Sequence, residues 1–191
     1  MIVLHIAAVK DTKLEQMDVK NAYLNGVLEE TIYMRQPKGY EVPGQERKLL
    51  KLKKGLYGLK QAGRVWNDML DQFLLEQGFT RLRSDPCIYV RINNGCPLVI
   101  IVYVDNLVLG SPSRKEVGAL KKVFKANFKM DDLGPLAYIL GIRVVRDRAA
   151  HALYLVQDAY VERVLERFGM ADCAPVSTPL PSGVSVFKHF S

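Results

Sequence analysis

Two aspartates lie near the ends of short apolar segments, and they are the side chains of this sequence best suited to chemistry. Asp18 lies near the end of segment 14–19, and Asp105 follows the apolar segment 98–104. A carboxylate at the end of a buried strand is costly unless it faces water or its charge is compensated. Two such carboxylates on neighbouring strands would form an oxygen-rich site for Mg²⁺, which prefers carboxylates and water. Each aspartate taken alone is also typical of an ordinary turn, so both interpretations stay open at this point.

The second aspartate belongs to a pair, Asp105-Asn106, that separates the apolar segments 98–104 and 107–109. Asp and Asn both tolerate positive φ, so we predict that this pair forms the two-residue turn of an antiparallel hairpin. A tight turn holds its side chains at a fixed place at the edge of a sheet. With Asp18 on a neighbouring strand, the carboxylates could hold two metal ions roughly 4 Å apart, the arrangement that serves phosphoryl transfer.

The charge distribution indicates a polyanionic partner. The chain has 27 basic and 20 acidic residues, a net charge of +7, which alone is weak support. The segment 47–64 is more informative, because it contains seven basic residues and no acidic one. We interpret this basic segment as a surface that meets phosphate, and a merely solvated face is the alternative. Its basic residues are Arg47, Lys48, Lys51, Lys53, Lys54, Lys60 and Arg64.

Other classes of site find little support in the sequence. Cys87, Cys96 and Cys173 are widely spaced, and the three histidines are scattered, which argues against a zinc site. Unpaired cysteines fit a reducing compartment, where they act as small core hydrophobes. No apolar run approaches the roughly 20 residues that span a bilayer. The apolar segment 1–9 has no preceding basic region and no convincing cleavage site. We therefore expect an intracellular protein, cytoplasmic or nuclear, that contacts no membrane.

Periodicity predicts the elements that must position these residues. Apolar residues at helical spacing predict helices over about 64–77, from about 113, and from Asp158 onward. Mixed elements with an antiparallel hairpin indicate an α+β fold, in which helices cover one face of an antiparallel sheet. We interpret 175–191, which lacks periodicity, as an irregular tail. The predicted strands are 14–19, 32–36, 48–53 (with one wet face), 87–92, 98–104, 107–109, 138–146 and 152–157. The residues expected inward on the last helix are Val161, Val164, Leu165 and Phe168.

A series of short segments resembles, in order and in rough spacing, the landmarks of copia-type reverse transcriptases. Gln16–Gly26 resembles motif A of that family. Leu52–Trp66 resembles its Leu-Tyr-Gly-Leu-Lys-Gln-Ala-x-Arg-x-Trp block, and Tyr103–Asn106 is similar to motif C. The agreement extends over about residues 1–180. The other matching segments are Ile32–Tyr40, Asp85–Tyr89, Asp132–Gly134, Ile139–Ile142 and Ser177–Leu180.

This resemblance implies a polymerase-type palm over residues 1–174, with the fingers and thumb incomplete. It implies an RNA-directed DNA polymerase that adds deoxynucleotides to a primer 3′ end with two Mg²⁺ ions. Asp18 would be the motif A metal ligand, and Asp105 would be the metal-bridging carboxylate of motif C. The implied partners are an RNA or DNA template–primer, dNTPs and other parts of a Pol polyprotein, and the oligomeric state stays open.

The resemblance also assigns further site residues. Tyr23 would be an aromatic gate that excludes a 2′-hydroxyl beneath the sugar, and a core aromatic is the alternative. The implied nucleotide-binding loop contains Gly58, Lys60 and Gln61, where glycine lets the backbone approach closely. Trp66 lies on the apolar helix face and is expected in the core. The implied nucleic-acid contacts are Lys51, Lys53, Lys54 and Arg64, with Leu140 and Gly141 as the turn that grips the primer end.

The sequence departs from the family pattern in its chemistry and at its ends. Asn106 stands where the family has the second aspartate of motif C, and Gly63 stands where it usually has proline. A unit charge about 4 Å from a metal charge contributes about 4 kcal/mol at an effective dielectric of 20, and half of that slows a reaction more than tenfold. The family also has a fingers segment before residue 1, and more of the thumb and an RNase H domain after Leu180. We therefore expect weak or absent activity. The alternative is a non-catalytic nucleic-acid-binding or interaction module from a domesticated or decaying retroelement.

Overall fold

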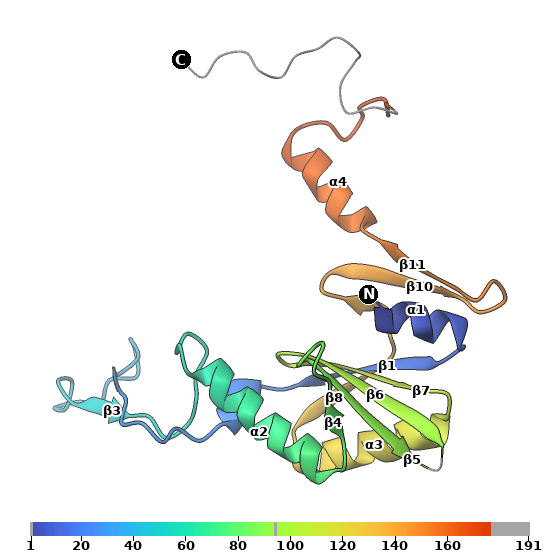
Figure 1. Ribbon diagram of the computed structural model, residues 1–191. Coiled ribbons are helices and arrows are strands. Elements are labelled where there is room, and N and C mark those ends of the chain that lie inside the picture. Colours follow the sequence, from blue (N-terminus) through green and yellow to red (C-terminus); the bar gives the residue numbers. More distant parts are fainter. Residues whose placement is uncertain (1, 94, 177–191) are drawn as a thin grey trace.

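An antiparallel six-stranded sheet is the central element of the fold (Figure 1). The structure, a computed structural model, describes residues 2–93 and 95–176. Every neighbouring pair of strands in this sheet is antiparallel, in the order β4-β5-β6-β7-β1-β8. The predicted α+β class with an antiparallel sheet is thereby confirmed. The strands are β1 (Lys13–Val19), β4 (Thr80–Arg81), β5 (Ile88–Asn93), β6 (Cys96–Tyr103), β7 (Asn106–Ser111) and β8 (Met130–Pro135).

Two amphipathic helices, α2 (Ala62–Glu76) and α3 (Arg114–Asn127), pack on one face of this sheet. Their buried side chains recur at the helical period and share one core with residues of β1, β5, β6 and β7. The hydroxyl of Ser113 caps α3 by accepting from the backbone N–H of Glu116. The predicted helices over 64–77 and from about 113 are confirmed, although the first begins two residues earlier. Their buried residues include Trp66, Leu70, Leu74, Val117, Leu120 and Phe124.

The apolar segment 1–9, which shows no helical periodicity, forms helix α1 (Ile2–Val9) against the opposite face of the sheet. Leu4 of α1 packs with Val108 of β7, whose neighbours Leu107 and Leu109 point toward α2 and α3. Figure 1 shows α1 between this sheet and the strands β10 and β11. Only Leu4, Ala7 and Ala8 of α1 are buried there, while the apolar side chains of Ile2, Ile6 and Val9 remain exposed. The expectation that helices lie on one face only is therefore wrong.

A second, three-stranded antiparallel sheet contains β9 (Tyr138–Ile139), β10 (Ile142–Asp147) and β11 (Ala152–Val156). Its centre strand holds α1 in place. Arg146 of β10 donates to the carbonyl oxygens of Ala7 and Ala8, at 3.3 and 3.0 Å. Those carbonyls belong to the last turn of α1, where a positive charge is also favourable to the helix dipole. The predicted strand over 138–146 is interrupted by a tight turn at residues 140–141.

Two peripheral elements are less covered than the sequence indicates. The two-stranded sheet of β2 (Tyr33–Arg35) and β3 (Leu49–Lys51) has all three β3 residues exposed, so the strand expected over 48–53 is shorter and wet on both faces. Helix α4 (Asp158–Arg167) confirms the predicted last helix, although its N-cap is Gln157 and Asp158, expected as the cap, is its first residue. Its expected inward face is not buried by the described part of the chain. The interpretation of 175–191 as a tail lies outside the described residues, except for 175 and 176. No helix in the described ranges has the length and apolar character needed to cross a membrane.

A buried lysine joins α3 to the neighbouring strands β1 and β8, at one edge of the sheet. Lys121 is only 8% exposed, and its ammonium group forms ion pairs with Glu15 of β1 and with Asp132 of β8, the latter at 2.6 Å. Asp132 also accepts from Lys125 at 3.3 Å and from the backbone N–H of Gly134 at 3.1 Å. These bonds hold the pKa of Asp132 below its usual value. Periodicity does not mark β8 as a strand, and this network is what attaches it to α3.

Replacing Lys121 by methionine should lower the free energy of unfolding by roughly 2 kcal/mol at neutral pH, because Glu15 and Asp132 lose their shared cation. Urea unfolding of the variant measures this loss. The adjacent Lys122→Met serves as the control, since Lys122 is exposed. Asp132 has a lowered pKa in the folded state, so its contribution is present above its unfolded pKa and is lost as the pH falls. The difference between wild type and Lys121→Met should therefore shrink in acid, and a difference independent of pH would contradict this account.

Candidate functional site

Asp18 and Asp105 lie at the same end of the six-stranded sheet. Asp18 of β1 is opposite Asn106 of β7, and the backbone N–H of Val19 donates to the carbonyl of Asp105 at 2.8 Å. The charge of Asp105 contributes to the raised pKa of Asp18, so the two carboxylates interact electrostatically. Strand pairing between β1 and β7 therefore produces the juxtaposition that the sequence could only suggest.

The turn of the β6–β7 hairpin differs by one residue from the prediction. Tyr103 pairs with Asn106, so the turn residues are Val104 and Asp105, and Asn106 is the first residue of β7. Val104 has a φ of 56°, a left-handed conformation that is strained for a β-branched residue. The indole N–H of Trp66 donates to the carbonyl of Val104 at 2.6 Å. Trp66 is buried, as expected, and this bond explains how α2 stabilises the strained turn that presents Asp105.

The ionised form of Asp18 is disfavoured in this structure. Its pKa is raised, chiefly by burial, then by the charges of Asp105 and Asp131, and Lys20 only partly opposes them. Asp131 of β8 is opposite Asp18 on the side away from β7, and it pairs with Lys20 at 2.8 Å. Asn106, Asp18 and Asp131 thus form a row across three neighbouring strands. Asp131 and Lys20 had no predicted role at the site. Only the register of β8 brings Asp131 beside Asp18, whereas Lys20 is two residues after Asp18 in the sequence.

Asn106 is held by hydrogen bonds within the sheet. Its amide oxygen accepts from the side-chain amide of Gln16 at 2.8 Å, and its amide nitrogen lies 3.5 Å from a carboxylate oxygen of Asp105. The oxygen of Asn106 is therefore already engaged by Gln16, and its nitrogen is a donor directed toward Asp105. An aspartate at this position would keep the bond from Gln16 and would add a negative charge beside Asp105 and Asp18.

Two tyrosines adjoin the carboxylates. The rings of Tyr23 and Tyr57 are in contact, with centroids 4.3 Å apart and planes inclined by 36°, and the hydroxyl of Tyr57 donates to Asp105 at 3.2 Å. Burial and the nearby charge of Asp105 raise the pKa of Tyr57, so its proton stays available for that bond. Tyr23 is half-buried and packs against the main core, which leaves room for both roles considered for it. Tyr57 was not among the predicted site residues, although it lies next to Gly58 in the motif-like block 52–66.

Comparison with known proteins gives the family. The family model described as reverse transcriptase (RNA-dependent DNA polymerase) matches residues 1–182. The chain belongs to the copia-type reverse transcriptase family. It is similar to the retrovirus-related Pol polyprotein from transposon TNT 1-94 of Nicotiana tabacum, with 43% identity over 97% of the chain and 14% of that polyprotein. It is also similar to the Pol polyprotein from transposon RE1 of Arabidopsis thaliana, with 34% identity over 94% of the chain and 12% of the relative.

A shorter relative is the putative transposon Ty5-1 protein of Saccharomyces cerevisiae, 30% identical over 92% of the chain and 56% of that protein. No solved structure gave a significant match. The chain therefore spans about one seventh or less of the length of the two Pol polyproteins. The predicted resemblance to copia-type reverse transcriptases is confirmed.

The residues assigned to nucleotide binding by family resemblance lie at the start of α2. Gly58 has a φ of 98°, with open space where a side chain would be, and Lys60 is exposed. Gln61 donates to Glu30 at 2.9 Å, and Arg64 forms an ion pair with the same carboxylate at 3.4 Å. Both side chains are thus engaged by Glu30 in this structure, and their roles stay predictions.

Besides Arg64 of α2, the residues assigned to nucleic-acid contact lie on two separate parts of the fold. Lys51, Lys53 and Lys54 are exposed in and after β3. Leu140 and Gly141, with φ values of 52° and 77°, form the turn between β9 and β10, and Leu140 is exposed there. The contact of this turn with a primer stays a prediction.

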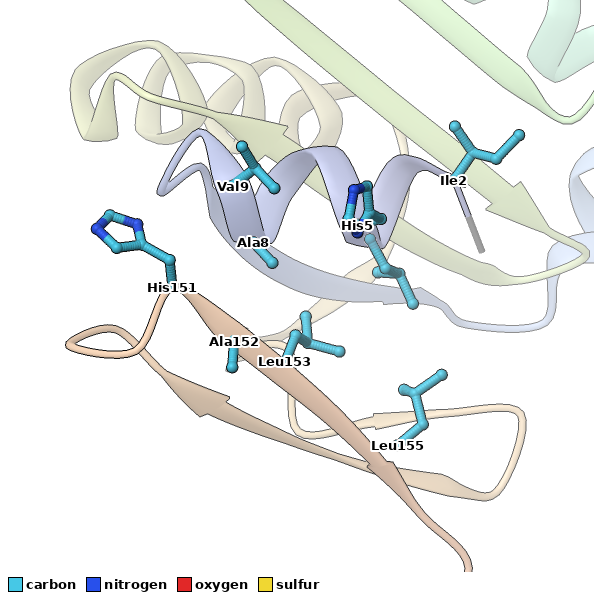
Figure 2. A pocket seen from close by; sticks show the side chains of 9 residues that line it. Ile2, His5, Ala8, Val9, His151, Ala152, Leu153 and Leu155 are labelled. Carbon is cyan, nitrogen blue, oxygen red and sulfur yellow. The ribbon is translucent and has the colours of Figure 1, made fainter.

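The fit of a divalent cation depends on Asp18 and Asp105. Among the described residues, no group of three or more His, Cys, Asp or Glu side chains is arranged to hold a metal ion. The two carboxylates offer oxygen ligands, and their mutual repulsion is what a cation between them would relieve. A groove of about 530 Å³ between α1 and β11 is a different feature, since its lining is apolar apart from two histidines (Figure 2). It has no carboxylate, and it is not part of this site.

Replacing Asp18 by asparagine should stabilise the metal-free chain by roughly 0.5 kcal/mol at neutral pH, because a partly buried carboxylate repelled by Asp105 and Asp131 is removed. The raised pKa of Asp18 means that its ionisation disfavours the folded state, so the gain should appear as the pH rises through that pKa. The gain should vanish in acid, where the carboxyl is neutral. Urea unfolding across pH measures it, with the exposed Asp68→Asn as control. Equal effects of both variants would contradict the assigned repulsion.

Replacing Gly63 by alanine should raise the free energy of unfolding by about 0.5–1 kcal/mol, because glycine in a helix costs backbone entropy. A Cβ at this position would meet the hydroxyl of Tyr23 at 3.6 Å, an ordinary contact. Gly55→Ala is the matched control, since its Cβ would lie 2.7 Å from the carbonyl of Tyr23 and should destabilise. Thermal unfolding distinguishes the two. A loss of stability in Gly63→Ala would show that the start of α2 requires glycine.

Proposed function

We propose that this chain carries the nucleotidyl-transfer site of an RNA-directed DNA polymerase, in a form with weak or no activity. The observation that supports the proposal is the juxtaposition of Asp18 and Asp105 by the pairing of β1 with β7. The ancestral reaction joins a deoxynucleotide to the 3′ hydroxyl of a primer. We also propose that residues 1–174 are the palm part of a longer polymerase, since the polyprotein relatives are several times longer than the chain.

The chemistry assigned to the chain itself is positioning. Asp18 and Asp105 would hold two Mg²⁺ ions, which supply positive charge to the attacking and leaving oxygens of the transfer. Trp66 fixes the backbone of the turn, and Tyr57 orients the carboxylate of Asp105 through its hydroxyl. The ring of Tyr23, in tilted contact with Tyr57, would lie beneath the sugar and exclude a 2′-hydroxyl by shape.

Asn106 is the reason to expect impairment. A polymerase site of this kind depends on negative charge to concentrate divalent cations, and asparagine contributes none. A lost unit charge about 4 Å from a metal is worth about 4 kcal/mol at an effective dielectric of 20. The bond from Gln16 further reduces the availability of the amide oxygen, which is in any case a weaker magnesium ligand than a carboxylate.

A second candidate, a non-catalytic nucleic-acid-binding module, is favoured by one specific observation. Of the seven basic residues in 47–64, only Arg64 forms an ion pair within the described part of the chain. The other six are exposed. Such binding should be independent of sequence and should weaken steeply with salt, because phosphate contacts release counterions. Salt-insensitive binding, or none, would exclude this candidate.

Primer extension tests the catalytic proposal. On an RNA template with Mg²⁺ or Mn²⁺, the wild-type chain should extend a primer weakly or not at all, and Asn106→Asp should extend it more than tenfold faster. The restored carboxylate adds the missing charge and keeps the bond from Gln16. Robust synthesis by the unmodified chain would contradict the assigned impairment.

A binding measurement keeps the metal site testable when no variant extends a primer. Titration of Mn²⁺ followed by electron paramagnetic resonance should show tighter binding in Asn106→Asp than in wild type. Asp105→Asn, which removes a carboxylate one position away, should bind more weakly than wild type. The same Mn²⁺ affinity in all three proteins would show that these residues hold no cation.

A further inference from the structure

The ribbon formed by β2 and β3, residues 33–35 and 49–51, is a separate feature with unusual exposure. Figure 1 shows it projecting away from the six-stranded sheet, beyond α2. Tyr33 is 57% exposed and Leu49 is 56% exposed. A two-stranded hairpin with both faces in water is marginally stable at best. Both the stability of the ribbon and the exposure of its aromatic and apolar side chains therefore need an explanation.

The strand register sorts the side chains of the ribbon into two different faces. Tyr33 is opposite Lys51, and Arg35 is opposite Leu49, so these four side chains share one face. Met34 and Leu50 share the other face. One face of the ribbon therefore combines an aromatic ring with two cations, and the other is apolar. This aromatic–basic face consists of Tyr33, Arg35, Leu49 and Lys51.

The cations of this face have no acidic partner within residues 2–93 and 95–176. Neither Arg35 nor Lys51 forms an ion pair with a described residue, whereas Lys20, Lys121 and Arg146 each do. The two acidic residues of the loop between β2 and β3 accept hydrogen bonds from backbone groups of the same loop. Glu41 accepts from the backbone N–H of Gly39, and Glu46 accepts from that of Gly44, each at 2.7 Å. Since neither glutamate pairs with Arg35 or Lys51 in the described part of the chain, both cations are available to an external anion.

The ribbon is organised before any partner binds. The amide group of Gln36 donates to the carbonyls of Gln45 and Lys48, at 2.6 and 3.2 Å, and accepts from the N–H of Val42 at 2.8 Å. These bonds close the loop between the strands. The other end is joined to the segment after Tyr23, where the N–H of Leu28 donates to the carbonyl of Lys53 at 3.1 Å. A surface fixed at both ends loses little freedom on binding.

We propose that the aromatic–basic face of the ribbon binds an unpaired nucleic-acid strand, with a base stacked on Tyr33 and phosphates held by Arg35 and Lys51. Stacking on an exposed ring together with adjacent cations is the combination that binds single strands without sequence preference. A duplex hides the faces of its bases, so it offers Tyr33 nothing to stack on. The proposal rests on the nucleic-acid binding proposed above, but it needs neither Asp18 nor Asp105.

The test uses the full chain and short mixed-sequence oligonucleotides, single-stranded and as blunt duplexes, with fluorescence anisotropy at several salt concentrations. The single strand should bind more tightly than the duplex. Tyr33→Val should weaken single-strand binding about tenfold, and Tyr33→Phe, which keeps the ring, should bind like wild type. Lys51→Gln should lower the slope of log affinity against log salt by about 0.7.

Two control variants distinguish a specific effect of the aromatic–basic face from a general effect of substitution on folding or charge. Met34→Val changes the opposite face of the same strand, and Lys115→Gln removes an exposed lysine on α3. Both should bind like wild type. Ultraviolet cross-linking of a bromouracil-substituted single strand, followed by mass spectrometry, should identify Tyr33 in the wild-type chain, independently of any variant that fails to fold.

The outcomes distinguish this proposal from the one on which it rests. If the chain binds nucleic acid but Tyr33→Val and Lys51→Gln behave as wild type, or if duplex binds as well as single strand, the ribbon proposal is overturned and nucleic-acid binding stands. If the wild-type chain binds neither form, nucleic-acid binding itself is overturned, and the ribbon proposal with it.

Discussion

The strained turn of the β6–β7 hairpin is the constraint on which the site depends. Val104 adopts a left-handed conformation that a β-branched residue rarely occupies, and two hydrogen bonds from other elements maintain it. One comes from the indole of Trp66 on α2, and the other from the backbone of Val19 on β1. The buried face of α2 and the pairing of β1 with β7 therefore act on the same few atoms. Packing in the core in this way determines where the carboxylate of Asp105 lies at the edge of the sheet.

The sequence predicted those parts of the structure that depend on local patterns. Apolar spacing was sufficient for α2 and α3, and alternation was sufficient for β1. The β6–β7 hairpin was predicted from the two apolar segments on either side of Asp105-Asn106. Apolar spacing failed for α1, because the exposed residues Ile2, Ile6 and Val9 are as apolar as the buried ones, so the segment shows no amphipathic period. The turn was predicted one residue too late, because Asp-Asn is a more favourable turn sequence than Val-Asp. In the structure, the hydrogen bond from Trp66 to the carbonyl of Val104 outweighs that local preference. Tyr57 was missed because its role arises from Asp105, 48 residues away.

Charge is used in two distinct ways in this molecule. Lys121, Arg146 and Lys20 are paired with carboxylates or carbonyls, and they connect α3, α1 and β8 to the strands. The basic residues of the ribbon and the segment after it, in contrast, are exposed and mostly unpaired. Ion pairs inside a fold require specific geometry, whereas a surface that meets phosphate requires only positive charge without local competitors. The segregation of paired from unpaired cations is thus a physical reason to assign the ribbon to an external polyanion.

Asn106 brings these arguments together. In a metal-free site, a third charge beside Asp18 and Asp105 would add repulsion to a carboxylate whose pKa is already raised by burial and by its neighbours. Asparagine removes that repulsion, accepts from Gln16 and places a donor near Asp105. The change therefore favours the folded, metal-free chain and disfavours the concentration of cations that transfer chemistry needs. With asparagine at this position, the hairpin, the bond from Trp66 and the contact between Tyr23 and Tyr57 are all kept, because none of them requires a negative charge at residue 106.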